Sequence, residues 1–149
     1  MDVIGYTLSE EEIKMINQKV SQFQSSLLLD MAVLMDEGGR LISFAPYNDK
    51  FKPLAYRVAI IGAAVVGAVD QLENIISSKR SMFFSGAEKN MYVHMINNRF
   101  MFTSVFSQKV PLGTVKLMKE RVSRELVQIL DKAVARGETQ VVRFEDLAI

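Results

Sequence analysis

One apolar stretch, Val58–Val69 (VAIIGAAVVGAV), restricts the possible folds of this chain more than any other feature. It carries no charged residue around the whole circumference of a helix. Its 12 residues are fewer than the roughly 20 that cross a bilayer. A helix lying on one sheet needs only one apolar stripe. The stretch therefore predicts a helix of a soluble protein with two buried faces, one on its own sheet and one on another partner.

Small residues recur along this helix. Ala59, Ala63 and Gly67 follow one another at four-residue spacing and share one side of the helix. Another backbone could therefore approach this row closely. The helix either lies at the centre of the monomer or packs against the same helix of a second copy. We favour the second copy and assign Ala59, Ala63, Val66 and Gly67 to a dimer interface.

The composition argues against several classes of function. The length of 149 residues is that of a single domain. With 18 basic and 17 acidic residues, the chain lacks the basic excess of a nucleic-acid-binding protein. It has no cysteine and one histidine, His94, so thiol chemistry is excluded and a histidine metal site lacks partners. No phosphate-binding glycine loop or hydrolase motif occurs. We expect no catalytic residue, metal or cofactor.

The hydrophobic periodicity predicts three helices and five strands. Ser9 and Glu12 form a capping-box pattern at the start of the first helix, and Gly137 is placed to cap the end of the last one. A strand-like segment, Gln140–Phe144, follows in the tail. The expected elements are a helix over Ser9–Leu28, strands over Met31–Met35 and Leu41–Ala45, a helix over Pro53–Ser77, strands over Ser81–Gly86, Met91–Ile96 and Phe100–Phe106, and a helix over Pro111–Arg136.

Polar residues and glycines mark the predicted turns. Gly38 and Gly39 supply positive φ angles between the first two strands, and Asp36 accepts backbone hydrogen bonds there. Asn97 and Asn98 tolerate the left-handed conformation that a tight hairpin requires. Both turns therefore predict antiparallel pairing of their neighbouring strands.

The third predicted strand, Ser81–Gly86, contains Phe83 and Phe84 but no charged residue. If this strand lies at an edge of the sheet, it invites pairing with another chain. We therefore add Phe83 and Phe84 to the dimer interface and expect a two-fold dimer built by strand addition and helix packing.

Two stretches resemble the Roadblock family, the domain of dynein light-chain roadblock proteins and of MglB-type bacterial proteins. The first is LLLDMAVLMDEGGRLISFA, Leu27–Ala45, and the second is KVPLGTVKLMKERVSRELVQIL, Lys109–Leu130. The resemblance implies an α+β three-layer sandwich in which a five-stranded antiparallel sheet carries one helix on one face and two on the other. It also implies dimers that pair their third strands and second helices.

The resemblance implies a domain over residues 9–136, with an N-terminal extension, 1–8, and a tail, 137–149. The implied function is that of a cytoplasmic homodimeric regulator or scaffold that binds a small Ras-like GTPase, without catalytic residues of its own. Whether it stimulates GTP hydrolysis stays open. We assign Arg57, Asp70, Glu73 and Phe144 to partner contacts.

Two other functions remain open. One is a structural adaptor like a dynein light chain, with no effect on GTP hydrolysis. The other is a small-molecule sensor module like a profilin or longin domain, for which the sequence reveals no converging polar residues.

Overall fold

The computed structural model describes residues 5–77 and 81–147, and their side chains as far as Gly137. Its order of elements is the one expected from the sequence. The elements are α1 (Glu10–Leu27), β1 (Met31–Asp36), β2 (Leu41–Ala45), α2 (Lys52–Ile76), β3 (Ser81–Ser85), β4 (Lys89–Met95), β5 (Phe100–Ser107) and α3 (Leu112–Leu147).

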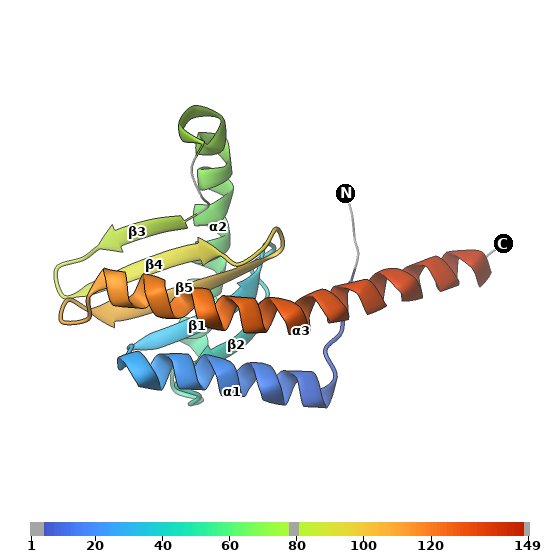
Figure 1. The fold of residues 1–149 in the computed structure, drawn as a ribbon, viewed down its shortest axis with the longest axis horizontal. Coiled ribbons are helices and arrows are strands. Elements are labelled where there is room, and N and C mark those ends of the chain that lie inside the picture. The colour runs from blue at the N-terminus through green and yellow to red at the C-terminus, as the bar shows by residue number, and fades with distance from the viewer. Residues whose placement is uncertain (1–4, 78–80, 148–149) are drawn as a thin grey trace.

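The five strands form an open antiparallel sheet in the order β2-β1-β5-β4-β3. Helix α2 covers one face, and α1 and α3 lie side by side on the other (Figure 1). The three-layer α+β sandwich predicted from the sequence is therefore confirmed.

Strand β1 lies at the centre of this sandwich and is buried on both faces, as its unbroken apolar run predicts. Ala32 and Leu34 point to the α1 and α3 side, whereas Met31, Val33 and Met35 point to α2. The sheet thus separates two hydrophobic cores, and each core is closed by a different set of helices.

The predicted capping box forms at the start of α1. The Ser9 hydroxyl accepts a hydrogen bond from the Glu12 N–H at 3.1 Å, and the Glu12 carboxylate accepts one from the Ser9 N–H at 2.8 Å. Arg136 of α3 also donates to Glu12, at 2.6 Å. This bond, followed by the bond from Ser9, holds the pKa of Glu12 below its usual range. A local cap therefore also joins α1 to α3.

The two predicted turns differ in outcome. Asp36 Oδ1 accepts from the N–H groups of Gly38 and Arg40, both at 3.0 Å, and Gly39 has φ +84° as expected. The left-handed conformation predicted at Asn97 and Asn98 is wrong, because neither residue has a positive φ. Instead, Asn97 Oδ1 accepts from the N–H groups of the two residues that lead into β5.

The predicted end of the last helix is also wrong. Helix α3 continues through Gly137 to Leu147, across the segment expected to be strand-like. The glycine serves a close contact, because a Cβ at residue 137 would collide with the Gly5 carbonyl oxygen. We call residues Gly5–Leu8 the N-terminal strap, since this segment crosses α3 at Gly137 and places Tyr6 in the core.

Candidate protein interface

The inner face of α2 packs on the sheet of its own chain. At its centre, Gly62 lies over Met35 and Thr103, where an added Cβ would come within 3.2 Å of both side chains. The missing side chain therefore lets the helix lie close to β1 and β5. The buried residues of the helix are Ala55, Val58, Ala59, Gly62, Val66 and Val69.

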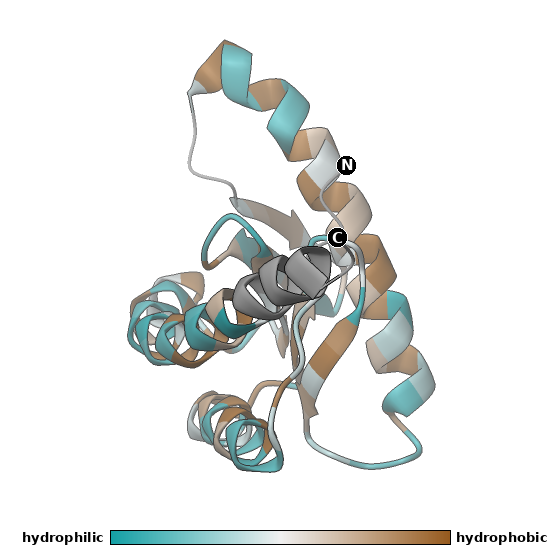
Figure 2. Cartoon of the chain, turned by 90° about the vertical axis from the view of Figure 1, so that its right-hand side faces the viewer, coloured by the Kyte–Doolittle hydropathy of each residue, from teal (hydrophilic) through white to brown (hydrophobic). Residues whose placement is uncertain are grey.

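The opposite side of the same helix is apolar as well, and it is exposed. Ile60 is 64% exposed and Ile75 is 75% exposed, although isolated soluble domains seldom present long contiguous apolar patches. The helix is hydrophobic along much of its length in Figure 2. We define the α2 outer face as the exposed residues Tyr56, Ile60, Ile61, Ala64, Gly67, Ala68, Leu72, Ile75 and Ile76.

The last two turns of α2 extend past the sheet. Residues 71–77 are all exposed, and this part of the helix rises beyond β3 at the top of Figure 1. A helix gains most of its stability from packing of its apolar side. The apolar side chains of Leu72, Ile75 and Ile76 receive little of that packing within the chain.

Strand β3 ends the sheet beside this projecting helix. In the part of the chain that the structure describes, it pairs with β4, and no strand pairs with its other edge. Phe83 and Phe84 are 39% and 40% exposed. They point to opposite faces of the sheet, as neighbours in a strand do, and Phe83 stacks on Phe106 on the α1 and α3 side. The condition set in the sequence analysis is therefore met: β3 lies at an edge of the sheet.

The predicted helix contacts divide between the two sides of α2. Ala59 and Val66 are buried in the core between α2 and the sheet. Ala63 lies 3.6 Å from the position that a Cβ on Gly39 would occupy, so part of the small-residue row receives the β1–β2 turn of the same chain. Gly67 is exposed on the outer face.

Sequence analysis missed the large residues of the outer face, above all Ile60, Ile61 and Ile75. Their signal was present, because they follow the helical period on the side opposite Gly62 and Val66. Only the structure shows which of the two apolar sides lies on the sheet.

The residues assigned to partner contacts surround the outer face. Arg57 and Glu73 are exposed, and Asp70 is half-buried. Arg57 also lines a mostly apolar hollow of about 420 Å³ together with Leu54 and Met91. The side chain of Phe144 lies outside the described residues.

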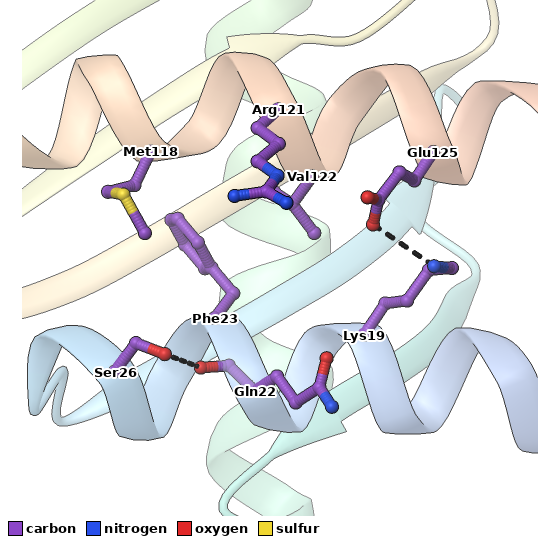
Figure 3. A pocket seen from close by; sticks show the side chains of 8 residues that line it. All are labelled: Lys19, Gln22, Phe23, Ser26, Met118, Arg121, Val122 and Glu125. Carbon is purple, nitrogen blue, oxygen red and sulfur yellow. Dashed lines mark hydrogen bonds and ion pairs between the residues drawn. The ribbon is translucent and has the colours of Figure 1, made fainter.

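A second surface groove, of about 250 Å³, lies between α1 and α3. Figure 3 shows Lys19 and Glu125 forming an ion pair across it at 3.0 Å, with Arg121 reaching over Phe23. Because this ion pair already joins its two walls, the groove belongs to the contact between the two helices.

Helix α2 is long and apolar enough to cross a membrane by length and composition alone. The sequence analysis judged the apolar stretch too short to cross a bilayer because it counted only the 12 residues Val58–Val69, whereas the whole helix has 25 residues. Its inner face nevertheless forms one layer of the sandwich. Insertion would therefore remove the cover from one face of the sheet. Within the described residues, no three His, Cys, Asp or Glu side chains gather in a way that could hold a metal ion.

The fold of the chain is shared with proteins of known structure. It has the Roadblock/MglB-like fold, an open antiparallel sheet between one helix and two. No protein-family model and no curated protein matches the sequence.

Solved structures similar to the chain include MglB from Myxococcus xanthus, 25% identical, with a TM-score of 0.74 over 85% of this chain and 96% of that one. The gliding protein MglB from Thermus thermophilus is 22% identical, with a TM-score of 0.75 over 87% and 98%. A Roadblock/LC7 domain from Streptomyces avermitilis is 9% identical, with a TM-score of 0.62 over 83% and 98%.

Proposed function

We propose that this chain is a cytoplasmic homodimeric regulator that binds a small Ras-like GTPase and acts on it without catalytic residues of its own. The observation that supports the dimer is the α2 outer face, an exposed apolar strip on a helix that contacts β3, the strand whose second edge no described strand pairs with. The GTPase as partner rests on the likeness to MglB and Roadblock structures.

Two copies related by a two-fold axis would cover both features at once. Their β3 strands would pair edge to edge and continue the sheet, and their α2 outer faces would pack together above it. The projecting turns that carry Leu72 and Ile75 would then contact the second copy. Such a contact would combine strand hydrogen bonds with apolar burial, and a stable interface buries about 800 Å² on each partner.

The GTPase would meet the dimer at the rim of the paired helices. Arg57 and Glu73 are exposed there, and their opposite charges suit a partner surface of mixed charge. Rim charges contribute to specificity and association rate more than to affinity. An effect on GTP hydrolysis would come from repositioning groups of the GTPase.

The test is single-turnover GTP hydrolysis by a Ras-like GTPase from the same organism, with binding measured in parallel. We expect saturable binding, and we expect Arg57→Ala to weaken it by about 1 kcal/mol or less, up to fivefold, as for one exposed charge. Arg124→Ala is the matched control, since Arg124 is an exposed arginine on α3, and binding should be unchanged.

The outcomes separate the functions. Binding with faster hydrolysis supports a GTPase-activating regulator, and binding without acceleration supports a scaffold. Failure to bind the GTPase in either nucleotide state would refute the proposed partner, whatever the oligomeric state of the chain.

A further inference from the structure

A polar cleft opens on the side of the sheet opposite α2. It has a volume of about 490 Å³ and lies between the first turns of α3 and the β3–β4 edge of the sheet. Tyr92 in its wall belongs to the core on the α1 and α3 side. The cleft is therefore separate from the α2 outer face, although its wall includes Ser81 of β3, the strand that pairs in the proposed dimer. Its polar and aromatic lining includes Ser81, Tyr92, His94, Asn98, Lys116 and Lys119.

His94 is a buried group without a partner in this cleft. The residue is 1% exposed, and neither Nδ1 nor Nε2 has a hydrogen-bond partner. Its ring stacks on Tyr92 at 5.1 Å and packs on Phe102 at 5.8 Å between centroids. Burial, and secondarily the charge of Lys119, hold the pKa of His94 well below its usual range. The imidazole is therefore neutral and presents one donor and one acceptor.

Two ammonium groups converge on the same wall. Lys116 Nζ lies 5.8 Å and Lys119 Nζ 5.5 Å from the centre of the Tyr92 ring. Neither lysine forms an ion pair within residues 5–77 and 81–137. Glu120 is the acidic residue among those that line the cleft, which leaves the lining with a net positive charge. Two like charges held together favour an anion between them.

We propose that this cleft binds a small molecule bearing an oxyanion, either a carboxylate or a phosphate. The ammonium groups of Lys116 and Lys119 donate to the oxyanion, and the His94 imidazole hydrogen-bonds a polar atom of the same ligand. The volume lies within the range of about 300–1,000 Å³ that small-molecule sites occupy. The converging polar residues that a sensor needs come from β3, β4 and α3, so no single segment of sequence reveals them.

The experiment uses His94 as its probe, because it is the one histidine in the chain. Imidazole resonances of the ¹⁵N-labelled protein are followed during titration with inorganic phosphate or succinate, at constant pH and with sodium chloride holding the ionic strength. We expect a saturable shift with one or both anions. Phosphate alone would identify a phosphate-bearing ligand, and succinate alone a carboxylate.

Lysine variants test the geometry. Lys116→Gln and Lys119→Gln should each weaken binding by about tenfold, the loss of one charge-assisted hydrogen bond. Lys132→Gln, an exposed lysine farther along α3, should leave binding unchanged. Lys116 is exposed and Lys119 half-buried, so both variants should fold, and a backbone amide spectrum checks this.

Several outcomes would overturn the proposal. They are a shift that never saturates, an equal shift with chloride, or binding that survives in both cleft lysine variants. Saturation by a glutamate-rich peptide, with no response to phosphate or succinate, would also overturn it and would make the cleft a docking site for a protein.

Discussion

At the scale of single residues, the most consequential side chain is a buried histidine. His94 sits mid-strand with its ring between Tyr92 and Phe102, and folding excludes a proton from it. Its pKa is therefore lower in the folded chain than in the unfolded chain, where it lies near the usual histidine value of about 6.5. This difference links the folding stability to pH.

We predict that acid destabilises the protein through His94. As the pH falls, the unfolded chain takes up a proton on His94 that the folded chain does not. The contribution of neutral His94 to the free energy of unfolding is therefore fully present above about pH 6.5 and is lost as the pH falls below that value. The slope should approach about 1.4 kcal/mol per pH unit, the limit for one proton. Urea unfolding between about pH 7.5 and about pH 5, values chosen to bracket that pKa, measures it.

His94→Phe is the matched variant, because it keeps an aromatic ring between the same neighbours and cannot titrate. Carboxylates contribute equally to both proteins, so the difference between the two curves isolates the imidazole. Parallel curves for wild type and variant would show that His94 takes up its proton in the folded state.

The hydrogen bonds of some other residues could be predicted from the local sequence. Ser9 and Asp36 accept the backbone hydrogen bonds expected of them, because these bonds join neighbours within four positions. Asn97 acts through its side chain instead of its φ angle. Both conformations suit asparagine, so the sequence alone could not choose between them.

At the scale of elements, the feature that the sequence could not predict is which side of α2 faces the sheet. The sequence predicted the existence and extent of α2, because its apolar run is long. It could not decide whether Ala59 or Ile60 faces the sheet, since both sides are apolar. In the structure the side with Ala59 and Gly62 is inside, because small residues allow the helix to lie close to Met35 and Thr103.

The end of α3 was also predicted wrongly, because the sequence alone did not show the role of Gly137. Glycine is a residue type that commonly follows the end of a helix. In the structure, Gly137 instead leaves room for the N-terminal strap, which lies more than 120 positions away in the sequence. Long-range contacts of this kind leave no periodic signal in the sequence.

We predict that Gly137→Ala destabilises the fold by about 1–3 kcal/mol, as overpacking does. The new Cβ meets the Gly5 backbone, which cannot turn aside as a side chain can. Release of the strap would also loosen Tyr6, whose hydroxyl donates to Asp36 at 2.8 Å and whose ring packs on Phe100. Urea unfolding measures the loss.

Gly113→Ala is the control on the same helix, because a Cβ added there would meet no other part of the described chain within 4 Å. It should be neutral or stabilise the protein by up to about 1 kcal/mol, the usual gain for alanine over glycine. A Gly137→Ala protein as stable as Gly113→Ala would refute the close contact.

At the scale of the whole molecule, the two candidate binding surfaces lie on different sides of the sheet. One presents the α2 outer face and the β3 edge, and the other presents the polar cleft above Tyr92. The order of helices and strands was predictable from the hydrophobic pattern, and the resemblance to the Roadblock family implied their three-layer arrangement. The cleft was not predictable, because Ser81, His94 and Lys119 meet only after the sheet has formed.

We predict that Ile60→Glu converts a dimer into a folded monomer. Burying an unpaired carboxylate between two helices should cost on the order of 3 kcal/mol or more, which weakens the dimer more than about a hundredfold. Light scattering after size-exclusion chromatography gives the mass, and thermal unfolding checks the fold.

Leu117→Glu controls for the charge itself, because Leu117 is 72% exposed on α3, away from the predicted interface. That variant should stay dimeric. A wild-type monomer at micromolar concentration, or equal dissociation of both variants, would refute the dimer across α2.

The central place of β1 also bears on how the chain is made. Its partner β5 ends at Ser107, while β1 itself ends at Asp36. At a synthesis rate of roughly 5–20 residues per second, β1 waits about 4–14 seconds on the ribosome before its second neighbour emerges. During that time β2 is the one sheet neighbour available to its backbone, and its apolar side chains lack the cover that the rest of the sandwich provides. We therefore expect nascent chains to be most prone to aggregation in this interval.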